Sequence, residues 1–208
     1  SSTTNGEYWG IGLGYRNVTN GSYQKSSIVQ VQRGDGNARG DIAFLNDNTA
    51  SSVNADLDDT RMVIKASGNV GINTTLPQSL LDVQGAVDAP GLLTLATKTT
   101  DVVAGKELGR INFNAPLESD GTDAILPGAS IWAVAEGTFA ADSNATSLVF
   151  ATGSSEAAAA KVTVSSGGNM TLNTATGQLL LPLSNDAVTP TLAFGDGDTG
   201  FYEESDGQ

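Results

Sequence analysis

Two short stretches, "GNVGIN" at residues 68–73 and "GNMTLN" at residues 168–173, set the main constraint on the fold. Each begins with a Gly-Asn pair, which supplies the positive φ angles of a tight turn. Each continues as a short alternating apolar run, which is typical of a strand. The two stretches lie 100 positions apart. Their likeness predicts that one turn-and-strand unit is written twice in this chain.

The segments that precede the two turns correspond as well. In chain order, the matched pairs are "GIGLGY" with "GRINF", "SSIVQVQ" with "ASIWAVA", "GDIAFLND" with "TSLVFATG", and "RMVIKASGN" with "KVTVSSGGN". Their order is preserved while the offset drifts only from 100 to 106. An ordered series favours internal repetition over coincidence in a biased composition. We therefore expect an all-β fold made of short-strand repeat units.

This pattern divides the chain into four parts. They are repeat unit 1 at 1–85, a connector at 86–105, repeat unit 2 at 106–183, and the truncated start of a further segment at 184–208. Within the connector, Pro90-Gly91 indicates a turn, followed by a strand at 92–96. The stretches 154–162 and 74–85 have some helical character. The first is barely two turns long, and isolated helices of that length are marginal in water. We expect the second to form a turn that leads into a strand.

Composition excludes several classes of function. The chain has 23 acidic and 10 basic residues, a net charge of −13, no histidine and no cysteine. The acidic balance disfavours nucleic acid and anionic membranes as partners. The missing residue types exclude a Ser-His-Asp triad, a disulfide scaffold and cysteine metal sites. No apolar run approaches the roughly 20 residues that span a bilayer. We expect no catalysis, no cofactor, no metal and no membrane insertion.

Three acidic motifs have turn-forming neighbours. They are "ARGDIA" at 38–43, which contains an Arg-Gly-Asp tripeptide, "DLDD" at 56–59, and "GDGDTGF" at 195–201, whose spacing resembles the start of a calcium loop. The bidentate glutamate that closes such a loop would fall at Gly207. We expect all three motifs to be turns or solvated loops.

A carbohydrate-cleaving site is an alternative. Glu118, Asp120 and Asp123 lie close to Trp132 in the sequence, and glycoside hydrolysis uses two carboxylates roughly 5–10 Å apart. The same stretch, "LESDGTD", is also a good hairpin loop. We favour the loop.

Two stretches of the chain also resemble segments of a known protein family. "SGNVGINTTLPQSLLDVQGAV" at 67–87 resembles the "GNVGIGTTxPxxxLxVxG" signature of bacteriophage tail fibres and related fibre proteins, with Asn73 where glycine is usual. "TPTLAFGDGDTGFYEESDG" at 189–207 resembles another recurrent fibre segment. The likeness covers most of residues 60–208. It implies a parallel homotrimer with intertwined β structure.

The predicted function follows from this resemblance. We expect an elongated, intertwined homotrimeric fibre, in which the chain is a structural shaft segment that projects a receptor-binding tip for host attachment. The expected location is the virion, outside the cell. Candidate partners are the chain itself, other virion fibre or baseplate proteins, and a host surface glycan or receptor. Alternatives are a carbohydrate-binding or depolymerising fibre domain, and a bacterial surface adhesin or capsid-attached fibre.

The candidate residues are therefore structural. Four should set the turns: Gly68, Asn69, Gly168 and Asn169. Ten apolar residues should face the interior or the trimer axis: Ile28, Phe44, Ile64, Ile72, Ile111, Phe113, Ile131, Phe150, Val164 and Leu172.

Overall fold

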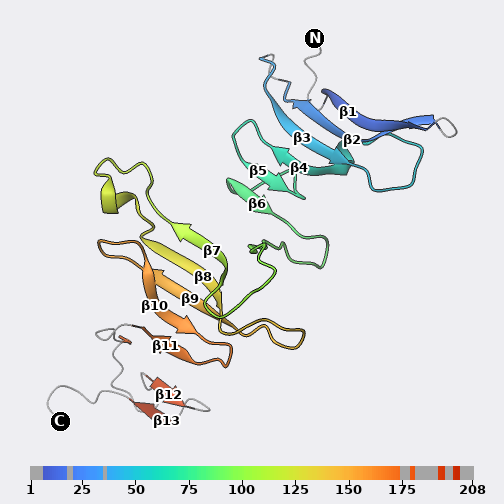
Figure 1. Ribbon diagram of the computed structural model, residues 1–208. Helices are drawn as coiled ribbons and strands as arrows, with labels where there is room; N and C mark the ends of the chain where they lie inside the picture. The colour runs from blue at the N-terminus through green and yellow to red at the C-terminus, as the bar shows by residue number, and fades with distance from the viewer. Residues whose placement is uncertain are drawn as a thin grey trace. The chain divides into compact units, whose positions relative to one another are not determined.

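The computed structural model describes residues 7–17, 21–34, 37–173, 179–180, 192–194 and 199–201. The chain divides into two compact units, Ser1–Thr94 and Leu95–Gln208, each of which is described by itself. The division falls inside the predicted connector. The ribbon is built from strands and two short 3-10 turns, so the all-β expectation is confirmed (Figure 1). Among the described residues, no helix has the length and hydropathy of a membrane-spanning segment.

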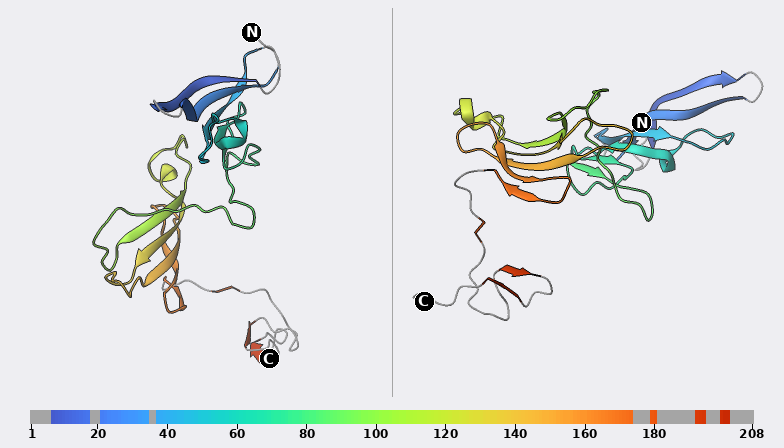
Figure 2. Two further views of the ribbon diagram at one scale, coloured as in Figure 1. Left: turned by 90° about the vertical axis from the view of Figure 1, so that its right-hand side faces the viewer. Right: turned by 60° about the horizontal axis from the view of Figure 1, so that its bottom comes forward.

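Unit 1 holds a six-stranded sheet, called sheet 1. Its strands follow chain order: β1 (Tyr8–Asn17), β2 (Gly21–Gln32), β3 (Gly40–Asn46), β4 (Thr60–Ile64), β5 (Val70–Ile72) and β6 (Leu81–Val83). Neighbours are antiparallel, except that β5 and β6 are parallel. Only residues 26–32 of β2 pair with β3, so the far part of the β1–β2 hairpin extends beyond the rest of the sheet (Figure 2).

Unit 2 holds a five-stranded antiparallel sheet, called sheet 2. Its strands are β7 (Glu107–Phe113), β8 (Ala129–Ala135), β9 (Thr146–Thr152), β10 (Ala159–Val164) and β11 (Met170–Leu172). The 3-10 turns are η1 (Leu57–Asp59) in unit 1 and η2 (Thr122–Ile125) in unit 2. A separate pair, β12 (Leu192–Phe194) with β13 (Thr199–Phe201), follows near the C-terminus.

The two sheets pair their strands in the same register. In sheet 1, Ile11 lies opposite Ile28, which lies opposite Phe44. In sheet 2, Ile111 lies opposite Ile131, which lies opposite Phe150. The series continues across the remaining strands. Phe44 lies opposite Met62, which lies opposite Ile72; Phe150 lies opposite Val162, which lies opposite Leu172. That the two units are copies of one repeat stays a prediction.

The Gly-Asn turns have the same hydrogen bonds. The N–H of Lys65 donates to the carbonyl of Asn69 at 2.8 Å, and the N–H of Ser165 donates to the carbonyl of Asn169 at 2.9 Å. Gly68 and Gly168 have φ angles of 96° and 80°, which glycine adopts without a steric cost. The four predicted turn residues therefore lie in two hairpin turns, one between β4 and β5 and one between β10 and β11.

The expectations for three shorter segments had different outcomes. The strand expected at 92–96 does not form, because the segment makes no backbone ladder with a strand, although Leu95 lies against Gly109 of β7. The alanine-rich stretch 154–162 is not helical, since its second half pairs with β9 as β10. The stretch 74–85 is a turn that leads into β6, as expected. The sequence also predicts that the two repeats diverge after Asn173, and residues 174–178 lie outside the described residues.

Candidate interaction surface

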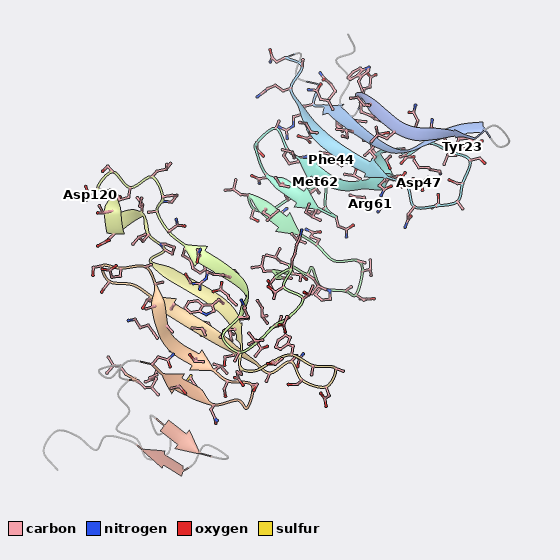
Figure 3. All side chains as sticks on the ribbon, in the orientation of Figure 1. Tyr23, Phe44, Asp47, Arg61, Met62 and Asp120 are labelled. Atoms are coloured by element: carbon pink, nitrogen blue, oxygen red, sulfur yellow. The ribbon has the colours of Figure 1, made fainter. Side chains whose placement is uncertain are left out.

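One face of sheet 1 is apolar and largely open, because alternate residues of each strand point to opposite faces. Cross-strand pairing groups the side chains of this face, called apolar face 1: Trp9, Ile11, Leu13, Ser26, Ile28, Gln30, Ile42, Phe44, Asn46, Met62, Ile64, Val70, Ile72, Leu81 and Val83. Ile11 retains 68% of its possible exposure, Trp9 51% and Ile42 44%. Figure 3 shows two members, Phe44 and Met62, on the neighbouring strands β3 and β4.

Sheet 2 has an equivalent surface, called apolar face 2. Its cross-strand pairs place these residues on one side of the sheet: Gly109, Ile111, Phe113, Ala129, Ile131, Ala133, Leu148, Phe150, Thr152, Val162, Val164, Met170 and Leu172. Phe113 is 55% exposed and Phe150 is 40% exposed. Neither apolar face carries a charged side chain, although the whole chain has 33 charged residues (10 basic, 23 acidic).

The opposite faces hold the buried residues. In sheet 1, Val29, Ala43, Leu45 and Val63 are buried, and the loop that carries Ala55 packs on three of them. In sheet 2 the buried residues of this face are smaller and partly polar: Ser130, Ser147, Val149 and Ala151. In each unit the fully buried residues of these strands therefore lie on one side of the sheet, called the covered side, and the other side keeps several large apolar side chains that are at least 40% exposed.

Charged side chains gather on the covered side and fix the turns. Asp41 on β3 accepts hydrogen bonds from Lys65 Nζ at 2.5 Å and from the N–H of Ala66 at 2.9 Å. Burial opposes ionisation of Asp41, but these hydrogen bonds and the charges of Lys65 and Arg33 outweigh it and lower the pKa of the carboxyl. The Asp41 carboxylate thus anchors the first Gly-Asn turn to the neighbouring strand.

The second turn has a comparable anchor. Glu136, just after β8, accepts hydrogen bonds from Ser147 Oγ at 2.5 Å, from Ser166 Oγ at 2.5 Å and from the N–H of Ser166 at 2.8 Å. The bond from Ser147 and then those from Ser166 lower the pKa of Glu136. A third acidic residue, Asp47, accepts from Lys25 Nζ and Thr49, which lower its pKa and tie the loop after β3 to β2.

A pocket of about 480 Å³ opens on the covered side of sheet 1. Its lining includes Val31, Ala43 and Leu57, together with the Asp41–Lys65 pair. The carboxylate of Asp41 is already occupied by its partners, and the described residues contain no buried side-chain N or O atom without a hydrogen bond. The buried polar side-chain atoms that line the pocket are therefore satisfied within the chain.

The sequence-predicted apolar residues all lie on the two apolar faces. None of the ten is buried within its own chain, and Ile28, Ile111 and Phe150 are at least 40% exposed. That they meet at a trimer axis stays a prediction. The ten predicted residues did not include Trp9, Ile11 and Leu13 of β1, although the alternation in "YWGIGLGY" indicates them.

The acidic motifs have structural partners. Asp41 of the Arg-Gly-Asp tripeptide is 8% exposed and ion-paired, so its carboxylate is not presented as an adhesion ligand. Asp56 and Asp59 form a capping box on η1. No group of three acidic residues suited to a metal occurs in the described part of the chain. Positions 195–198 of "GDGDTGF" lie outside it.

Trp132, the aromatic residue of the carbohydrate-cleaving alternative, has an arginine against its ring. The Arg110 guanidinium lies over the Trp132 ring, 4.0 Å from the ring centroid, and Arg110 is itself bound by Glu107. Asp120 lies in the loop after β7 (Figure 3), and Glu118 accepts hydrogen bonds from the adjacent Ser119. The arginine therefore covers one face of the indole, and the carbohydrate-cleaving site stays an alternative.

Comparison with solved structures gives matches at low sequence identity. No protein-family model matches the chain, and no curated protein matches it. One solved structure is the carboxy-terminal domain of the bacteriophage T5 L-shaped tail fibre with its intramolecular chaperone domain, at 13% identity and a TM-score of 0.36; the match covers 100% of this chain and 62% of that one. The chain thus spans less than two thirds of that structure's length. Another is the carboxy-terminal domain of the same fibre, at 12% identity and a TM-score of 0.36, covering 100% and 90%.

Proposed function

We propose that this chain is a structural shaft segment of a phage-type fibre, which assembles as a homotrimer through its two apolar faces. The observation that carries the proposal is the absence of charge from both faces in a strongly acidic chain. Large uncharged apolar patches on a sheet mark surfaces that other protein covers. A shaft segment would be stabilised by this surface. A repeat unit with an exposed apolar sheet face becomes more stable when another unit or chain packs on that face.

The energetic case rests on the exposed side chains. Burying an Ile, Leu or Phe side chain completely contributes roughly 1.5–3 kcal/mol. Side chains that are about half exposed would each contribute on the order of 1 kcal/mol when covered. Trp9, Ile11, Leu13, Ile28 and Ile42 of apolar face 1 are at least 40% exposed. Their combined contribution favours association of copies over a monomer.

The number three comes from the fibre resemblance at residues 67–87. In this proposal the chain is located on the virion, outside the host cell, and its partners are its own copies and other fibre or baseplate proteins. Its role is to hold a receptor-binding tip at a distance, where three identical chains gain avidity from weak contacts. No catalytic step is assigned to it.

Solution mass tests this proposal. Light scattering after size exclusion should give three times the 21.2 kDa mass of the chain, with the value unchanged over a hundredfold dilution. A compact monomer at high concentration would contradict the proposal. Incubation with bacterial surface polysaccharides should leave their chain length unchanged; cleavage by the purified chain would support the depolymerising alternative instead.

A further inference from the structure

The pocket on the covered side of sheet 1 has an apolar floor between two polar ends. Ala43 of β3 and Val63 of β4 lie opposite each other in the sheet and belong to this floor. Thr60 and Lys65 line the pocket at the two ends of the same stretch of chain. At about 3.3 Å per residue, the lining extends roughly 16 Å along this stretch. The volume of about 480 Å³ is that of a small-molecule site.

Two short segments of unit 1 form the walls above this floor. One is η1, which contributes Leu57 and Asp58 to the lining. The other is the loop after β5, which approaches the sheet at Gly71. An added Cβ at Gly71 would lie 2.3 Å from the carbonyl oxygen of Thr74 and 3.2 Å from Val63 Cγ1. The loop therefore lies over the sheet beside Val63, and its next residue, Thr75, lines the pocket.

The Lys65 end of the pocket has a compensated charge. Asp41 accepts a hydrogen bond from Lys65 Nζ at 2.5 Å, and the guanidinium of Arg33 lies 3.5 Å from the same carboxylate. Asp41 thus already has cations of its own chain beside it. A ligand cation would gain little at this end.

The Thr60 end has an uncompensated carboxylate. Asp58 is exposed, and its carboxylate has no hydrogen bond or ion pair with the described residues. The hydroxyl of Thr60 donates to the carbonyl of Leu57 at 2.7 Å, which leaves its oxygen able to accept a hydrogen bond. Thr75 adds a second, exposed hydroxyl. Oxygen acceptors with one net negative charge therefore stand at this end.

The lining is a feature of unit 1 and not of the strand pattern that both sheets share. Matching the two ladders places Thr163 of β10 where Val63 lies in β4, and Ser165 where Lys65 lies. The equivalent surface of sheet 2 thus has a polar floor and no lysine at its end. Repetition of the sheet alone does not account for the pocket.

We propose that this pocket binds a primary ammonium group on a short alkyl stem: the stem packs on the apolar floor, and the three N–H groups donate to the Asp58 carboxylate and to the hydroxyl oxygens of Thr60 and Thr75. A free alkylamine and a lysine side chain both have this chemistry. The inference goes beyond the proposed shaft role. It does not require association of copies, because the pocket lies on the side of sheet 1 opposite apolar face 1.

Titration of the full chain followed by ligand-observed NMR tests the site with three probes of equal stem length: n-butylammonium, n-butanol and n-butyrate. n-Butylammonium should bind roughly tenfold more tightly than n-butanol, the factor that a charge-assisted hydrogen bond contributes. n-Butyrate should bind more weakly than either, because Asp58 and the net charge of −13 repel it. Tighter binding of n-butyrate than of n-butanol would give the Lys65 end the dominant role and overturn the inference.

Two variants locate the binding. Asp58→Asn should reduce the affinity for n-butylammonium to that for n-butanol, while the unchanged affinity for n-butanol shows that the pocket is still formed. Thr75→Phe, at an exposed position of the lining, should weaken binding of both probes because the ring fills the mouth of the pocket. Two probes that keep their parent affinities in both variants would bind elsewhere, which overturns the inference.

A matched control removes the same charge from unit 1 outside the lining. Asp88 is exposed and has a φ of 60°, which asparagine adopts readily. Asp88→Asn should leave all affinities unchanged. Equal binding of n-butylammonium and n-butanol by the parent chain would contradict the inference. So would equal weakening by Asp58→Asn and Asp88→Asn, since that result reports only general attraction of a cation to an acidic chain.

N-acetyl-lysine methylamide separates the two sources of the ammonium group. Binding at least about tenfold tighter than that of n-butylammonium, or 1.4 kcal/mol, indicates a lysine side chain of a protein partner. Equal affinity indicates a free alkylamine, and both results support the site. None of these measurements depends on the solution mass, so a monomeric chain would overturn the proposed function and leave this inference intact.

Discussion

Asp41 and Glu136 accept a hydrogen bond from the same position of two different turns. Asp41 binds the N–H of Ala66 at 2.9 Å, and Glu136 binds the N–H of Ser166 at 2.8 Å. Both N–H groups lie two residues before the turn glycine. The carboxylates come from non-equivalent places, since Asp41 is within β3 and Glu136 follows β8. The two units thus fix the same backbone group from different strands.

These anchors predict sensitivity to acid. The pKa values of Asp41 and Glu136 are lowered in the folded chain, so their contribution to stability is present above their unfolded-state pKa values, near 4. It is lost as the pH falls through the lower folded values. Urea unfolding at a series of pH values should show the free energy of unfolding falling below about pH 4.

The variants Asp41→Asn and Glu136→Gln should each reduce that slope. Asp120→Asn, in the exposed loop after β7, is the control and should leave the slope unchanged. A slope that Asp41→Asn and Glu136→Gln leave as steep as in the parent chain would show that these anchors do not couple folding to pH.

Asn73 should be replaceable by glycine more readily than by alanine. Its φ is 58°, and its Nδ2 donates to the carbonyls of Gln84 at 3.2 Å and Gly85 at 3.0 Å. Asn73→Ala loses both bonds and forces alanine into the left-handed region, at a cost of about 2 kcal/mol. Asn73→Gly loses only the bonds, about 1 kcal/mol. Equal losses, measured by chemical unfolding, would contradict this account.

Gly85 should not tolerate a side chain. An added Cβ would overlap the carbonyl oxygens of Ala89 and Pro90, where the chain folds back after β6. Gly85→Ala should lower the free energy of unfolding by roughly 1–3 kcal/mol. Gly137 has no heavy atom within 4 Å of an added Cβ, so Gly137→Ala should change stability by less than about 0.5 kcal/mol. Thermal unfolding of the two variants is the test. Equal losses of stability in Gly85→Ala and Gly137→Ala would show that the clash at Gly85 is not the cause.

Three consecutive residues test whether apolar face 2 is an interface. Met170, Thr171 and Leu172 of β11 are all exposed, but only Met170 and Leu172 lie on apolar face 2. Met170→Lys and Leu172→Lys should weaken association at least about tenfold, because an unpaired ammonium becomes buried. Thr171→Lys adds the same charge to the opposite face and should leave the solution mass unchanged. If all three variants behave alike, this face is not the contact surface.

The sequence by itself determined the strands and the turns. Alternation places Ile28, Phe44, Ile131 and Phe150 on one side of their strands, because side chains alternate with a period of two residues. The Gly-Asn pairs at 68–69 and 168–169 fixed the hairpins, since glycine reaches positive φ without a steric cost. Each of these signals is local, lying within a few residues of the feature that it predicts.

The tertiary structure alone decided which side of each sheet the chain covers. Both sides of β3 are apolar in part, with Ile42 and Phe44 on one and Ala43 and Leu45 on the other. Loop 47–59 closes over Ala43 and Leu45, tied by the Lys25–Asp47 pair across 22 residues. The expected strand at 92–96 does not form, because a strand requires a backbone ladder with another strand, which sequence alternation does not supply. Pairing between distant residues, and not local preference, left the larger side chains exposed.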